Sequence, residues 1–223
     1  MLRGMADYDG RVRVGGPVQS REAGGLAITK VAVGPMDNNA YLLRDSASGE
    51  QLLIDAAAEA GTLLALVEQA GPLQQVLTTH RHADHWQALA GLVEATGART
   101  LAGVHDAEGI PVATDGRLVD GGEVAVGGSR LRVREIVGHT PGSVVLVWEP
   151  VDGPPHLFTG DCLFPGGPGR TTSPADFASI MDDLTERVFG ALPDGTWVYP
   201  GHGADTTLGA ERPHLEEWRA RGW

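Results

Sequence analysis

The sequence contains a single cysteine, Cys162, among 223 residues, so no disulfide bond can form within the chain. A chain without disulfides fits a reducing compartment. Long apolar runs are also lacking, since the longest, Val144–Trp148, is far too short to cross a bilayer. Residues 1–24 contain no apolar core of a signal peptide. These absences predict a soluble cytoplasmic protein that does not act at a membrane.

Basic residues are scarce as well. The 17 Lys and Arg residues are outnumbered by 29 Asp and Glu residues, which gives a formal net charge of -12. Nucleic acids and anionic membranes bind to basic surfaces, so neither is an expected partner. With 42% hydrophobic and 21% charged residues, the composition is that of a globular protein. We therefore expect a small-molecule substrate as the partner, and the composition leaves the oligomeric state open.

Hydrophobic periodicity predicts strands and helices along most of the chain after a polar, Gly-rich and flexible lead-in over residues 1–24. In the first half the predicted strands are Leu26–Val33, Ala40–Leu43, Gln51–Ile54, Gln75–Thr79 and Thr100–Ala102, and the predicted helices are Ala57–Ala70 and His85–Thr96. In the second half the predicted strands are Glu123–Val126, Leu131–Val137, Ser143–Trp148, His156–Thr159 and Thr196–Tyr199, with helices over Asp176–Phe189 and within Glu211–Trp223.

The two halves have a similar order of elements, which predicts two sheets packed together with helices outside. No linker rich in Pro or Ser divides the chain, so we expect a single domain over residues 1–223.

Potential metal ligands are concentrated directly after one predicted strand. Three imidazoles and one carboxylate lie within the run His80-Arg81-His82-Ala83-Asp84-His85. Imidazole nitrogen and carboxylate oxygen suit zinc, iron or manganese. On an extended turn His80 and His82 point the same way and can bind one ion, while Asp84 and His85 can face a second. The alternative is either a surface His-rich turn or a group of histidines that caps a helix with Asp84 as the N-cap.

Three further segments make that alternative weaker, because each places one ligand after a predicted strand. They are Gly138-His139-Thr140, Thr159-Gly160-Asp161 and Tyr199-Pro200-Gly201-His202. Small residues in each segment let the backbone turn sharply. Loops that follow neighbouring strands lie at the rim of a sheet, so the four segments predict one shared site.

The order His-x-His-x-Asp-His, Gly-His-Thr, Gly-Asp and Pro-Gly-His resembles the metallo-β-lactamase superfamily from about Leu26 to Asp205. The segments that begin at Gly160, Gly169 and Tyr199 are most similar to its glyoxalase II group. The resemblance implies an α+β fold, an αββα sandwich of two mixed sheets packed face to face with helices outside.

By motif position the resemblance also implies two divalent metal ions. Zinc is the expected metal, and iron and manganese are the alternatives. The implied ligands are His80, His82 and His139 for the first ion, Asp84, His85 and His202 for the second, and Asp161 as a bridge between them. Ions in two-metal hydrolases lie about 3.5–4 Å apart and activate a shared water.

The implied function is a metal-dependent hydrolase. His80, His82, Asp84, His85 and Asp161 would act through a metal-bridging hydroxide that attacks a thioester, ester or lactone.

Two features depart from the glyoxalase II group. Its full-length members carry a helical C-terminal domain that holds glutathione, and too few residues follow His202 for such a separate substrate domain. The second departure is Ser143, which follows Gly142 where the group usually has His. Both departures widen the expected substrate beyond glutathione thioesters.

Two other functions are compatible with the ligand set. One is a persulfide dioxygenase, a relative with a single iron held by two His and one Asp. The other is a metal-binding module without hydrolytic activity.

Several polar residues fall outside the implied ligand set. A nucleophilic role for Cys162 is disfavoured, because a lone cysteine is usually a core residue. Arg170 is either an ordinary loop residue or a contact for an anionic substrate, and Trp86 either packs under a helix or walls the pocket. Structural or surface roles are expected for His105, His156 and His214.

Overall fold

The computed structural model describes residues 8–222, and in this part of the chain two large mixed β-sheets are packed face to face. The larger sheet has the strand order β1-β2-β3-β4-β5-β6-β7. Its strands are β1 (Gln19–Ala23), β2 (Leu26–Val33), β3 (Asn38–Asp45), β4 (Gln51–Ile54), β5 (Gln75–Thr78), β6 (Arg99–Gly103) and β7 (Gly116–Leu118). Neighbours from β1 to β4 are antiparallel, and those from β4 to β7 are parallel.

The second sheet has the order β15-β14-β11-β10-β9-β8, and a separate hairpin joins β12 and β13. The strands are β8 (Glu123–Val126), β9 (Ser129–Glu135), β10 (Val144–Trp148), β11 (His156–Gly160), β12 (Leu163–Phe164), β13 (Gly167–Pro168), β14 (Trp197–Pro200) and β15 (Thr206–Thr207). Only β11 and β14 pair in parallel within this second sheet of the described chain.

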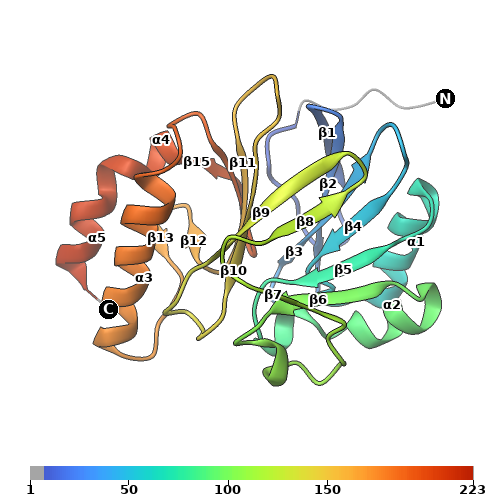
Figure 1. Ribbon diagram of the computed structural model, residues 1–223, viewed down its shortest axis with the longest axis horizontal. Coiled ribbons are helices and arrows are strands. Elements are labelled where there is room, and N and C mark those ends of the chain that lie inside the picture. The colour runs from blue at the N-terminus through green and yellow to red at the C-terminus, as the bar shows by residue number, and fades with distance from the viewer. Residues whose placement is uncertain (1–7, 223) are drawn as a thin grey trace.

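Helices cover the outer faces of both sheets, as Figure 1 shows. The helices on the larger sheet are α1 (Ala60–Ala70) and α2 (Leu89–Thr96). Those beside the second sheet are α3 (Pro174–Asp183), α4 (Leu208–Glu211) and α5 (Leu215–Arg221). Helix α3 continues as a π-helical segment over Leu184–Phe189. Ser173 caps α3 by accepting a hydrogen bond from Asp176 N, with Pro174 in the first helical turn. The predicted α+β, αββα architecture is therefore confirmed.

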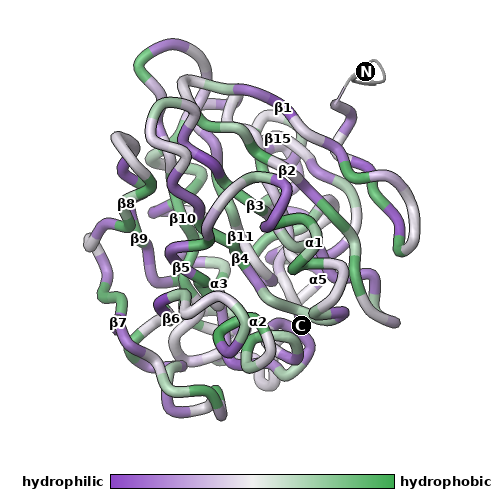
Figure 2. Tube along the Cα trace, turned by 90° about the vertical axis from the view of Figure 1, so that its right-hand side faces the viewer, coloured by the Kyte–Doolittle hydropathy of each residue, from purple (hydrophilic) through white to green (hydrophobic). Residues whose placement is uncertain are grey.

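The core has three layers because the central strands are apolar on both faces. In β3, Tyr41 and Leu43 pack between the two sheets, whereas Ala40 and Leu42 pack under α1 and α2. Alternate side chains of a strand point to opposite faces, so one buried strand contributes to two layers. A third layer lies between the second sheet and α3. Apolar stretches run along the central strands in Figure 2.

The structure corrects two sequence predictions. Residues 85–96 do not form one helix: a 3-10 turn over Ala83–His85 is followed by α2 from Leu89. The chain bends between them because Gln87 N and Ala88 N donate to Ala57 O and Ala56 O instead of to helical carbonyls. The prediction of a flexible lead-in over residues 1–24 is wrong for its last part, because Gln19–Ala23 forms strand β1 and pairs with β2. Residues 1–7 lie outside the described residues.

None of the helices within residues 8–222 has both the length and the apolarity needed to span a bilayer.

Candidate metal centre

The predicted ligands come together at one rim of the sandwich. The run from His80 to His85 follows β5, Asp161 follows β11, and His202 follows β14. His139 lies in the loop between β9 and β10. All seven predicted ligands fall within three overlapping groups in which the potential ligand atoms lie within 4.8 Å of one another.

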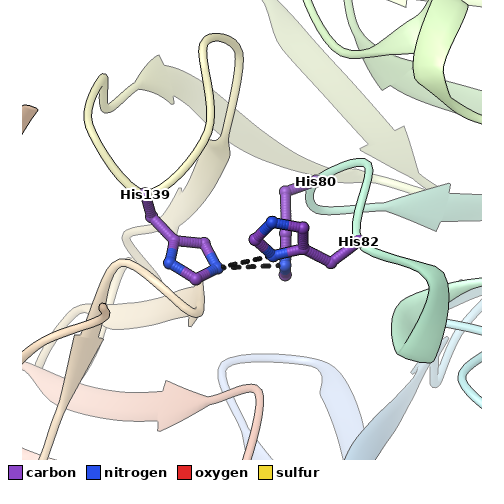
Figure 3. A group of neighbouring side chains, drawn as sticks. All are labelled: His80, His82 and His139. Atoms are coloured by element: carbon purple, nitrogen blue, oxygen red, sulfur yellow. Dashed lines mark hydrogen bonds between the residues drawn. The ribbon is translucent and has the colours of Figure 1, made fainter. Parts of the chain in front are cut away.

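The first group contains His80, His82 and His139, whose rings converge from two separate loops (Figure 3). His139 Nε2 lies 2.9 Å from His82 Nδ1 and 3.3 Å from His80 Nε2. His80 is buried, whereas His82 is exposed. The group therefore opens to the surface on the side of His82.

The second group contains Asp84, His85 and His202. Asp84 Oδ2 lies 3.5 Å from His85 Nε2 and 3.4 Å from His202 Nε2. Asp161 lies between the two groups: its Oδ1 is 3.3 Å from His85 Nε2, and its Oδ2 is 3.6 Å from His139 Nε2. One carboxylate thus faces ligands of both groups.

Four of the histidines contact an oxygen through Nδ1, which directs Nε2 into the centre. The oxygen is Thr79 Oγ1 for His80 (3.1 Å), Asp55 Oδ2 for His85 (2.8 Å), Arg170 O for His139 (2.7 Å) and Met36 O for His202 (2.9 Å). Such contacts set the tautomer and the orientation of metal-binding imidazoles. The arrangement is that of a preorganised ligand shell.

The donor atoms in the centre fit a cation. When Nδ1 of His80 and His139 carries the proton, their Nε2 atoms present two lone pairs to each other at 3.3 Å. His85 Nε2 and Asp161 Oδ1 are buried without a hydrogen-bond partner among the described residues. Buried polar atoms are costly unless they are paired, and cations bound in the two groups would satisfy these atoms.

The electrostatics of the centre also favour positive charge. Burial alone would lower the pKa of His202, but the Asp161 and Asp84 carboxylates raise it to about 10. Burial likewise opposes protonation of His85, and Asp55 and Asp161 raise its pKa to about 10. Burial opposes ionisation of Asp161, but the nearby His202 and His85 imidazoles hold the pKa of its carboxyl well below its usual range. The same negative potential would attract a metal ion.

Supporting residues of the centre were missed by sequence reasoning. Asp55 accepts hydrogen bonds from Thr79 N and Thr79 Oγ1 and faces His85 Nδ1. Its φ of 60° lies in the left-handed region, which is uncommon for a residue other than glycine. Asn38 Nδ2 donates to Asp84 Oδ2 at 2.9 Å. Asp55 follows β4 directly, so its position after a strand was the available signal.

The other residues that the sequence singled out belong to the surface or to the core. His105 and His214 are exposed and pair with Glu135 and Glu217, and His156 stacks in the core. Cys162 is buried, and burial raises the pKa of its thiol. Trp86 is half-buried against the layer under α1 and α2.

Comparison with known proteins is consistent with this geometry. Residues 33–202 match the metallo-beta-lactamase superfamily. The chain belongs to this superfamily. A hydroxyacylglutathione hydrolase from Fuscovulum blasticum is 38% identical over 168 residues, which cover 74% of this chain and 62% of that relative. The chain therefore matches less than two thirds of that relative's length.

Two solved structures are also similar to this chain. ETHE1 from Myxococcus xanthus has 30% sequence identity and a TM-score of 0.73, with 84% of this chain and 82% of that chain covered. TTHA1623 in a di-iron-bound form has 32% identity and a TM-score of 0.67, with 82% and 96% covered. Both solved structures share the fold in which the His and Asp groups of this chain converge.

Proposed function

We propose that this chain is a metal-dependent hydrolase of the glyoxalase II type that cleaves a thioester or a related ester or lactone. The observation that carries the proposal is the position of Asp161, whose two carboxylate oxygens face one histidine in each of the two groups of potential ligands. The similarity to hydroxyacylglutathione hydrolases supports the same reaction class.

In this proposal each ion has its own set of side chains. His80, His82 and His139 would hold the first ion, Asp84, His85 and His202 would hold the second, and Asp161 would be shared by both. When bound, two divalent cations would supply a water of lowered pKa and would polarise a carbonyl. We favour zinc; iron and manganese accept the same donors, and a similar protein is known in a di-iron-bound form.

The chain's own residues have defined tasks in this proposal. Oxygen atoms of Asp55, Met36 and Arg170 orient the imidazoles before any substrate arrives. Preorganised groups contribute to catalysis because they need no rearrangement in the transition state. The nucleophile is water, so the buried Cys162 takes no part.

A pocket beside the centre suggests the kind of substrate. Its volume is about 320 Å³, and its lining includes Arg170, Phe177 and Arg221. The carbonyl of Arg170 contacts His139, so the pocket adjoins the first group. Guanidinium groups bind carboxylates well, and an aromatic ring suits an apolar moiety. We propose that an anionic part of the thioester lies here.

One set of measurements on the same sample tests the proposal. Metal content per chain, thioester hydrolysis and oxygen uptake should give two ions, hydrolysis and no oxygen consumption. One iron per chain with oxygen uptake and no hydrolysis would instead establish a persulfide dioxygenase type of activity. Bound metal with neither activity would leave a non-hydrolytic metal-binding module.

A further inference from the structure

The first group of histidines depends on two loops that are distant in sequence. His80 and His82 follow β5, whereas His139 lies between β9 and β10, and their rings meet across the gap between the loops (Figure 3). Metal affinity requires that the ligand atoms of both loops keep their spacing. A group that holds both loops at once would therefore act on this site.

Asp106 contacts both loops through one fully buried carboxylate. Its Oδ2 accepts hydrogen bonds from Arg81 N at 3.0 Å and from Thr140 Oγ1 at 2.5 Å. Its Oδ1 accepts a hydrogen bond from Gly142 N at 3.0 Å. Arg81 lies between His80 and His82, and Thr140 directly follows His139. Each ligand loop is thus bound next to its histidines.

Two glycines allow Asp106 to reach this position. A Cβ on Gly142 would lie 2.6 Å from Asp106 N, and a Cβ on Gly103 would lie 2.2 Å from Gly142 O. Both distances are shorter than van der Waals contact, so the turn after β6 and the His139 loop touch backbone to backbone. The close packing brings the carboxylate between the two loops.

Ser143 also belongs to the hydrogen-bond network of Asp106, through Thr140. Because Thr140 Oγ1 donates its only proton to Asp106, the Ser143 hydroxyl must donate to Thr140 Oγ1, which lies 2.5 Å away. Ser143 stands where the glyoxalase II group usually has His. In this chain the small hydroxyl therefore joins the network that ends on Asp106.

We propose that Asp106 is a positioning residue for the first metal site, holding the spacing between the His80–His82 loop and the His139 loop. The proposal rests on the assignment of these three histidines as ligands of one ion. Charge-assisted hydrogen bonds to buried donors are stronger than neutral ones, which suits a carboxylate for this task.

The test measures Co²⁺ binding at each site separately. A His202→Ala background leaves the first site to be titrated, and a His139→Ala background leaves the second. In the first background we expect Asp106→Ala to weaken Co²⁺ binding by about 10–100-fold and to change the visible absorption bands. In the second background the affinity should change by only about twofold, because Asp84, His85 and His202 have no hydrogen bond to Asp106 in the described chain. Asp106 reaches the run that carries Asp84 and His85 only through Arg81 N, beside the ligands of the first site.

Asp45→Ala is the matched control. Asp45 is also buried, and its Oδ1 accepts hydrogen bonds from Ala47 N, Ser48 N and Ser48 Oγ, but its turn carries no ligand. This substitution should lower thermal stability and leave Co²⁺ affinity at the first site unchanged. Equal weakening by Asp45→Ala, or equal weakening of both sites by Asp106→Ala, would overturn the proposal.

Two milder variants keep the test decisive should Asp106→Ala fail to fold. Thr140→Val removes one hydrogen bond at nearly constant volume, and Asp106→Asn replaces one acceptor oxygen by a donor. Both should weaken Co²⁺ binding at the first site alone, and unchanged binding in both would refute the role. Absence of thioester hydrolysis in Co²⁺-loaded wild-type protein would contradict the proposed function, but it would not affect the result on Co²⁺ binding in the Asp106 variants.

Discussion

Adjacent residues can have opposite environments, as Asp161 and Cys162 show. Asp161 directs both carboxylate oxygens toward histidines of the centre. Cys162 points into the apolar layer between the second sheet and α3, where burial raises the pKa of its thiol. A thiol must be ionised to act as a nucleophile, so its location disfavours that role.

This contrast predicts different effects of two neighbouring substitutions. Asp161→Ala should lower kcat/KM by at least about 100-fold and reduce the metal content, because it removes the carboxylate proposed to bridge the two ions. Cys162→Ala should keep kcat/KM within about threefold and cost about 1–2 kcal/mol of stability through the lost packing. Steady-state kinetics, metal analysis and denaturant unfolding measure these effects. An inactive Cys162→Ala protein that retains its metals would make the thiol the nucleophile.

Arg170 tests the proposed substrate charge. Arg170→Gln should raise KM for a carboxylate-bearing thioester by about 10-fold, which corresponds to one lost charged hydrogen bond, with little change in kcat. A neutral thioester should show no such rise. Arg130→Gln is the control, because Arg130 is exposed on β9 and contacts only backbone carbonyls among the hydrogen bonds of the described chain. Equal effects on both thioesters would contradict an anion contact at Arg170.

At the level of secondary structure, periodicity predicted the interior elements best. The bounds of β2, β4 and β8 agree with the predicted strands. The strand β1 was missed because its sequence, Gln19–Ala23, has almost no apolar residues and lies at a sheet edge. The break before α2 was missed because it depends on hydrogen bonds to residues about thirty positions earlier, which no local pattern reveals.

The loop that carries His202 is held against β2 and the N-terminal segment by Lys30. The buried ammonium donates to Gly10 O (2.8 Å), Gly203 O (2.8 Å) and Asp205 Oδ1 (2.6 Å). Asp205 also accepts hydrogen bonds from Tyr8 Oη and Trp197 Nε1. One buried ion pair thus connects three segments that are distant in sequence.

Lys30→Met should therefore destabilise the protein by about 3–5 kcal/mol, since it leaves the buried Asp205 without its cation. Urea unfolding measures the loss. Arg132→Met is the comparison, because Arg132 and Glu149 form an ion pair at the surface, and it should cost less than about 1 kcal/mol. Similar losses in both variants would show that burial does not strengthen the Lys30 pair.

On the scale of the whole molecule, metal binding and folding should be linked. The proposed ligands come from both sheets, so bound ions would stabilise the folded arrangement over the unfolded chain. Free zinc at about 100 times its Kd should add about 2.7 kcal/mol for one site, and Tm should rise by roughly 5–10 °C over the chelated protein.

The same linkage predicts a pH dependence. If His85 and His202 hold an ion as proposed, binding displaces protons from their imidazoles, whose pKa values are raised to about 10. Protons compete more strongly as pH falls, so the zinc-induced rise in Tm should be smaller at pH 6 than at pH 8. Differential scanning fluorimetry with zinc or with a chelator measures this rise in Tm at each pH. A rise that is constant across this range would mean that neither histidine changes protonation on binding.

The sequence by itself determined which chemistry is available and roughly where. Strand periodicity placed the His and Asp residues at strand ends, because that pattern is local and the side-chain alternation of a strand is fixed. Only the tertiary structure decided which of these residues meet. The contact of His139 with His80, the orientation of His85 by Asp55 and the bridge of Asp106 between two loops all join segments far apart in the chain. Such contacts depend on how the sheets and loops pack in space, and no local pattern of residues encodes that packing.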